Sequence, residues 1–85
     1  MKHPIRVERY DGTDKELVRD ITNRRYDSLE EFYKLLSKKY SSDARKDMES
    51  GHPLVSLRLK IIAEYHEKIR EEFSSLWKIC EKYMR

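Results

Sequence analysis

The residues of this sequence with the most chemical potential are a histidine and a cysteine in its last third, His66 and Cys80. An imidazole can carry a proton or ligate a metal, and a thiolate can act as a nucleophile. His66 has no second ligand at the spacing of a metal site, because His3 and His52 are distant in the sequence. Cys80 lies among apolar residues, which favours a buried, unreactive thiol. We therefore expect a structural histidine and cysteine, with no catalytic, metal or cofactor site, and a protein that is not an enzyme.

Basic residues with aromatic neighbours form a second candidate site in residues 24–46. The set is Arg24, Arg25, Lys34, Lys38, Lys39, Arg45 and Lys46. Such side chains neutralise phosphates without reading bases, which gives salt-sensitive binding to nucleic acid. Acidic residues, among them Asp27, Glu30 and Asp43, share the region, as is typical of a mixed, solvated helix face. Nucleic-acid binding, or an accessory role in DNA or RNA machinery, is therefore the alternative hypothesis.

The C-terminal end carries the third candidate, a cluster of apolar and aromatic residues. The cluster is Ile69, Phe73, Leu76, Trp77, Tyr83 and Met84. Aromatic residues and methionine are enriched at protein interfaces. The protein's own helices can also cover such residues, so core and interface both stay open. The preferred hypothesis is a small non-enzymatic protein–protein interaction module, which self-associates or serves as an accessory subunit of a larger assembly.

A heptad pattern positions this cluster. Apolar residues and one histidine recur at alternating steps of four and three: Val55, Leu59, Ile62, His66, Ile69, Phe73, Leu76, Cys80 and Tyr83. The pattern predicts one long helix over 53–84 that packs on other helices, with Pro53 in its first turn. Ile61 and Tyr65 widen the apolar arc beyond the needs of a two-stranded coiled coil.

Upstream of the long helix, local signals predict an arm and a first short helix. Residues 4–10 alternate apolar and charged side chains without a partner strand, so we expect residues 1–12 to form an extended arm. Thr13 and Glu16 form a T-x-x-E capping box, which predicts a helix that begins at residue 14 and ends near residue 24 or 25.

Further capping signals follow in residues 26–51. Ser28 and Glu31 repeat the capping box and predict a helix over about 29–40. Ser41-Ser42-Asp43 is a third cap, for a short helix ended by Gly51 in a left-handed conformation. These elements predict an all-α fold, a small bundle of two to three short helices packed on one long C-terminal helix, with an extended N-terminal arm. We expect a single domain over 1–85, with the arm in 1–12, the short helices in 13–50 and the long helix in 53–84.

Composition limits the classes of protein further. The 85 residues carry a net charge of +3 and are 41% charged and 38% hydrophobic. Neither a signal peptide nor a membrane span is apparent, so we expect a cytoplasmic protein without a membrane partner. Glutamine is absent and Lys, Arg and Glu are abundant, a bias typical of hyperthermophile proteins. A chain this short also departs from average composition by chance, so a thermophilic source stays one of two readings.

Overall fold

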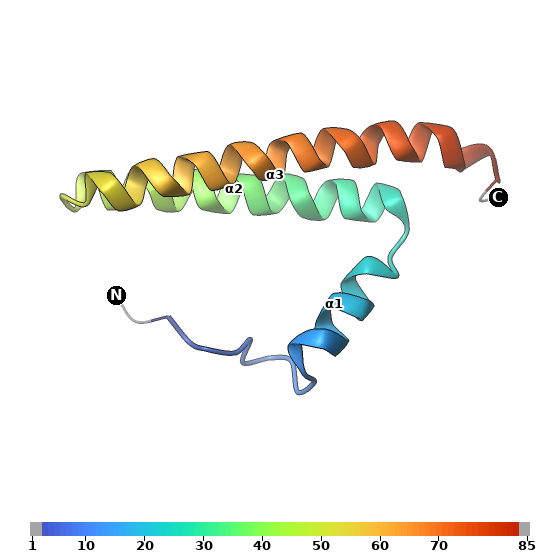
Figure 1. The fold of residues 1–85 in the computed structure, drawn as a ribbon, viewed down its shortest axis with the longest axis horizontal. Helices are drawn as coiled ribbons and strands as arrows, with labels where there is room; N and C mark the ends of the chain where they lie inside the picture. The colour runs from blue at the N-terminus through green and yellow to red at the C-terminus, as the bar shows by residue number, and fades with distance from the viewer. Residues whose placement is uncertain (1–2, 84–85) are drawn as a thin grey trace.

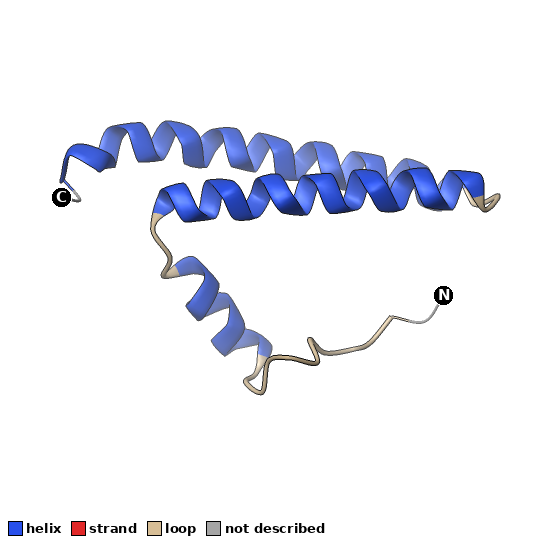
Figure 2. Cartoon of the chain, turned by 180° about the vertical axis from the view of Figure 1, so that it is seen from behind, coloured by secondary structure: helices blue, strands red, loops and turns tan. Residues whose placement is uncertain are grey.

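The computed structural model describes residues 3–83, and all regular structure in that range is helical (Figure 1). The elements are α1 (Asp14–Thr22), α2 (Tyr26–Glu49), α3 (Pro53–Cys80) and a 3-10 turn, η1 (Glu81–Tyr83). Helices α2 and α3 pack against each other as an antiparallel hairpin, and α1 projects from the start of α2 (Figure 2). The prediction of an all-α fold with a small helical bundle is confirmed.

The start of α1 follows the predicted capping box. The Thr13 hydroxyl accepts a hydrogen bond from the Glu16 amide at 3.2 Å, and the Glu16 carboxylate accepts one from the Thr13 amide at 3.1 Å. The helix ends at Thr22, before the predicted arginines: the Asn23 amide still makes the helical bond to the Arg19 carbonyl, whereas the Arg24 amide donates to the Ile21 carbonyl, only three residues back, at 3.2 Å. Residues 3–12 form bends and a turn with no strand, and the Tyr10 hydroxyl ties this arm to α1 by donating to Asp20 at 2.5 Å.

The predicted break after residue 40 is wrong, because one helix, α2, covers the two segments that the caps suggested. Asp43 accepts hydrogen bonds from Lys39 one turn earlier, at 2.6 and 2.7 Å, instead of capping a new helix. Ala44 is buried, and its carbonyl accepts a hydrogen bond from the Ser56 hydroxyl at 2.6 Å. Packing on α3 therefore overrides the preference of short polar residues for helix starts.

The second capping box is also absent, because α2 begins earlier than predicted. Tyr26 is the first residue of α2, and Arg25 is its N-cap without a side-chain capping bond. The Asp27 carboxylate instead accepts from the Ser28 amide at 2.9 Å and from Arg25 at 2.7 and 2.8 Å. A carboxylate in the first turn stabilises the positive end of a helix.

A tight turn joins α2 to α3. Gly51 has φ of +80°, as predicted for a left-handed residue after a helix. The Gly51 amide donates to the Met48 carbonyl at 3.1 Å, and the His52 amide donates to the Asp47 carbonyl at 2.8 Å. Pro53 then opens α3, where its missing amide costs nothing.

Small side chains line the contact between α2 and α3. Ala44, Ser56 and Ala63 are buried, and the Ser37 hydroxyl donates to the Ala63 carbonyl at 2.9 Å. Leu29 is the one large apolar side chain that is fully buried among the described residues. Small residues let two helices approach closely, but they bury little apolar area.

The position of α1 differs from the predicted arrangement of short helices on a long one. α1 does not lie along α3; only α2 packs on that helix over its length (Figure 1). The radius of gyration is 15.5 Å, against roughly 12 Å for a compact chain of this length. α3 itself ends at Cys80, short of the predicted residue 84, and η1 tightens the chain beyond it.

Candidate docking surface

One side of the seam between α2 and α3 is aromatic. The Tyr33 ring lies 5.8 Å from the His66 ring and 5.3 Å from the Phe73 ring, centre to centre. Tyr40 lies 5.4 Å from His66, and Tyr26 lies 6.2 Å from Phe73. These residues recur every seven positions on each helix, so they form one row along the hairpin.

The other side of the seam is charged. Arg70 binds Glu67 at 2.6 Å within α3 and reaches Glu30 of α2 at 3.4 Å. The hydrogen bond from Arg70 lowers the pKa of Glu67, and the nearby Lys34 and Lys38 lower it further. The hairpin therefore has a polar face on the Arg70 side of the seam, whereas the aromatic row lies on the His66 side.

The face on the His66 side is apolar and open. Around the axis of α3, His66 and Phe73 lie next to Arg70, and a row of apolar residues spaced by seven lies beyond them. Two apolar side chains of α2 lie on the same side of the hairpin as this row. We call these residues the apolar face: Val55, Ile62, Ile69 and Leu76 of α3, with Phe32 and Leu36 of α2. Val55 is 50% exposed, and Ile62 and Ile69 are each 38% exposed. The heptad stripe predicted to pack on other helices is thus only half covered by α2.

The reason for this half coverage lies in which residues of α3 meet α2. Ser56, Ala63, Arg70 and Trp77 face α2, one position along from the predicted row that begins at Val55. Small residues give closer contact with α2 than the branched residues beside them, which leaves the branched row outside the hairpin.

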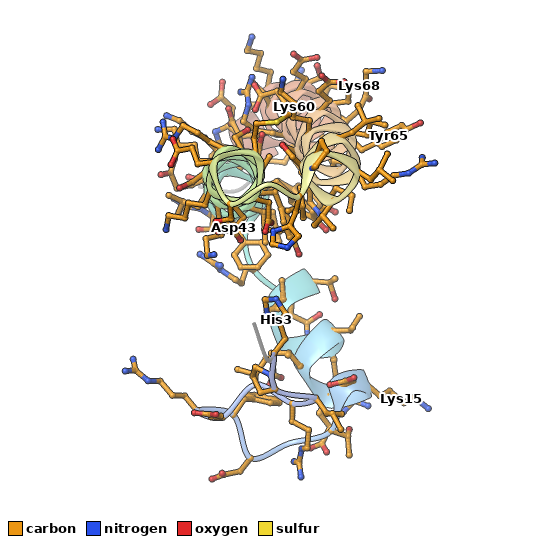
Figure 3. The ribbon with its side chains drawn as sticks, turned by 90° about the vertical axis from the view of Figure 1, so that its left-hand side faces the viewer. His3, Lys15, Asp43, Lys60, Tyr65 and Lys68 are labelled. Carbon is orange, nitrogen blue, oxygen red and sulfur yellow. The ribbon has the colours of Figure 1, made fainter. Side chains whose placement is uncertain are left out.

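α1 and the N-terminal arm lie on the same side of the hairpin as the apolar face. Figure 3 looks along the hairpin, with Asp43 on the side toward α1 and Lys60 and Lys68 on the other side. By helical rotation Asp43 shares its side of α2 with Leu36, whereas Lys60 shares its side of α3 with Glu67. α1 therefore projects from the hairpin on the side of the apolar face.

The link between α1 and α2 is anchored by two arginines. The Arg25 guanidinium carbon lies 5.2 Å from the centre of the Trp77 ring, and that of Arg24 lies 5.7 Å from the centre of the Phe32 ring. Arg25 also binds Asp27, and this hydrogen bond lowers the pKa of the Asp27 carboxyl. These contacts hold the direction in which α1 leaves the hairpin.

The structure divides the predicted C-terminal cluster. Ile69 and Leu76 belong to the apolar face, whereas Phe73 stacks on tyrosines of α2 and Trp77 lies under Arg25. Tyr83 is exposed in η1, and Met84 lies outside the described residues. The cluster missed Val55, Ile62, Phe32 and Leu36, although the seven-residue spacing from Ile69 pointed to the first two.

The predicted basic set is also divided. Arg24 and Arg25 lie over aromatic rings at the α1–α2 link, and Lys39 is paired with Asp43. Lys34, Lys38 and Arg45 fall on one side of α2 by their spacing, next to the polar face, and Lys46 falls on the other side. Three of the seven basic residues thus share one side of α2.

His66 and Cys80, the two residues with the most chemical potential in the sequence, both lie on α3. The His66 Nδ1 lies 2.8 Å from the Ile62 carbonyl oxygen. Because a carbonyl only accepts, Nδ1 carries the proton. Cys80 is half-buried near the end of α3. Within residues 3–83, no three His, Cys, Asp or Glu side chains converge in a way that could hold a metal ion.

The described helices are each too short or too polar for a bilayer-spanning segment. Comparison with protein-family models, with curated proteins and with solved structures found no match to this chain.

Proposed function

We propose that this chain is a small, non-enzymatic protein–protein interaction module that binds through the apolar face. The observation that carries the proposal is the solvent-accessible row of Val55, Ile62, Ile69 and Leu76. This row lies outside the contact through which α2 and α3 pack on each other. Contiguous apolar patches on protein surfaces typically mark interaction sites. The module either self-associates or serves as an accessory subunit of a larger assembly.

The physics of such a contact follows from its composition. The face gains free energy mainly by removing apolar area from water, at roughly 25 cal/mol per Å² before the costs of association. That gain has no large electrostatic part. Binding is therefore expected to persist in salt concentrations that screen surface charges.

A pair of matched variants tests the proposal. Ile69→Glu places a charge on the apolar face, whereas Leu35→Glu places the same charge at an exposed leucine on the outer side of α2. The immobilised wild type and Leu35→Glu should retain the same proteins, the chain's own copies included, and Ile69→Glu should lose them. Equal retention by all three would refute the proposal, provided that circular dichroism shows equal helix content.

Nucleic-acid binding is a second candidate, supported by the shared side of Lys34, Lys38 and Arg45 on α2. Glu67 lies close enough to Lys34 and Lys38 for them to affect its pKa, which offsets part of their positive charge. Anisotropy with duplex and single-stranded oligonucleotides tests this candidate. It requires binding that weakens steeply with salt and that is lost in Lys34→Glu with Lys38→Glu.

A further inference from the structure

We propose that the occupant of the apolar face is a second copy of this chain. The two hairpins pack face to face into a four-helix bundle, and the α1 of each copy lies against the hairpin of the other. This inference rests on the proposed function, since it names the partner for the same surface. Four features of the structure support it: area, charge, periodicity and the position of α1.

The area of the face matches what a dimer needs. α2 has 24 residues, which span about 36 Å at a rise of 1.5 Å each. Two packed helices are roughly 20 Å wide, so the side of the hairpin that carries the apolar face has a footprint of about 700 Å². A stable complex of standard size takes about 800 Å² from each partner. The nine residues of α1 add a strip of roughly 13 Å in length, which brings the total close to that value.

The charges of the face are compatible with self-association. A two-fold axis brings residues near their own copies, so a surface that binds itself must avoid unpaired like charges at its centre. The α3 row of Val55, Ile62, Ile69 and Leu76 carries no charge. On the α2 side of the face, Asp43 is neutralised by Lys39 at 2.6 Å, and the remaining charges, Lys46 and the Arg24 guanidinium over the Phe32 ring, lie toward the edge and away from the α3 row. The Arg70 ion pairs lie in and beside the seam between α2 and α3, away from the apolar face.

The periodicity of the face also matches this partner. Val55, Ile62, Ile69 and Leu76 are spaced by seven, a spacing that fits helices with the same coiled-coil repeat along a comparable length. A second copy presents the same row of Val55, Ile62, Ile69 and Leu76, with that repeat and over the same length. A second hairpin thus supplies both the period and the length.

α1 does not pack along the hairpin of its own chain, but it can pack on the hairpin of a second copy. Leu17, Val18 and Ile21 form its apolar stripe, and Val18 is 60% exposed. The molecule extends 30 Å along its second axis, whereas one layer of helices is about 10 Å thick (Figure 1). α1 and the arm therefore reach past the depth of one more layer of helices on the side of the apolar face (Figure 3). In a two-fold pair, each α1 then flanks the other copy's hairpin.

Light scattering of the full chain across concentration and salt tests the inference. We expect twice the chain mass of 10.4 kDa, unchanged by high salt. Ile69→Glu should halve the mass while helix content is kept, and Leu35→Glu should leave the dimer intact. If Ile69→Glu loses helix content, Ile62→Asn provides the milder change on the same face.

A second pair of variants tests the role of α1. Val18→Gln, in the apolar stripe, should weaken dimerisation, whereas Arg19→Gln, on the opposite side of α1, should not. Equal effects of the two would overturn the exchange of α1.

The same measurements separate this inference from the proposed function. A wild type that stays monomeric at all concentrations overturns the second copy as partner. If Ile69→Glu then still loses a different protein that Leu35→Glu retains, the interaction module stands without the dimer. If the two variants also retain the same proteins, both proposals fail. A dimer that Ile69→Glu leaves unchanged overturns this face as the interface.

Discussion

The guanidinium of Arg25 lies over the ring of Trp77, 5.2 Å from its centre, and so joins the first turn of α2 to the last turns of α3. Arg25 is also held by the Asp27 carboxylate. The two contacts close the open end of the hairpin, opposite the Gly51 turn, and they set the point from which α1 departs. Stability of the hairpin and placement of α1 therefore depend on one cluster.

Trp77→Ala should destabilise the hairpin by about 2 kcal/mol, since the ring is half-buried and full burial of such a side chain is worth more. Chemical denaturation followed by circular dichroism measures the change. Tyr65→Ala is the matched control, because Tyr65 lies on the outer side of α3 and is mostly exposed. A Trp77 variant no less stable than the Tyr65 variant would contradict the role of this cluster.

Ala63→Leu should overfill the seam and cost about 1–3 kcal/mol, because Ala63 is buried where α2 and α3 approach closely. Ser75→Leu adds the same side chain at an exposed position of α3. Thermal unfolding of the two variants compares them directly. The seam described above would be incorrect if the Ala63 variant unfolded at the same temperature as the Ser75 variant.

Gly51→Val should destabilise the protein by more than about 1 kcal/mol, since φ is +80° and a β-branched residue is strained there. Nothing lies within 4 Å of an added Cβ, so the cost comes from the backbone and not from a clash. Gly51→Asn should cost less, because asparagine tolerates the left-handed region. Denaturation midpoints in the order Gly, Asn, Val would agree with this reasoning, and equal values for Asn and Val would not.

Glu67 should make stability depend on acid pH. Its pKa in the folded chain is lowered from 4.5 by the hydrogen bond from Arg70. A group with a depressed pKa contributes stability above its unfolded pKa, and that contribution is lost as pH falls through the folded value. Glu67→Gln should therefore flatten the decline of stability below pH 4.5. Glu64→Gln, outside this ion pair, is the control, and identical acid profiles for both variants would argue against the Arg70 bond.

The signals that predicted structure correctly are local. The Thr13 and Glu16 box satisfies amides of its own helix, Gly51 supplies a backbone conformation that other residues resist, and Pro53 suits a first turn. Each of these depends on neighbours within a few residues. The helical class and the limits of the hairpin turn could be read from the chain for that reason.

Signals that failed were those for which a tertiary contact competed with a local preference. Ser41-Ser42-Asp43 has the composition of a helix start, yet burial of Ala44 against α3 keeps α2 continuous. The prediction of one helix over about 29–40 and a second, short helix between the Ser41-Ser42-Asp43 cap and Gly51 was wrong for this reason.

The sequence by itself determined that a seven-residue apolar pattern in α3 needs helical partners. Only the tertiary structure decided how that pattern is divided. The close approach allowed by Ala44 and Ala63 turns α3 so that His66 and Phe73 meet α2, while Ile62 and Ile69 stay outside. A periodicity states that an apolar stripe must be covered, but the width of the stripe that one neighbour covers depends on how closely the two helices pack.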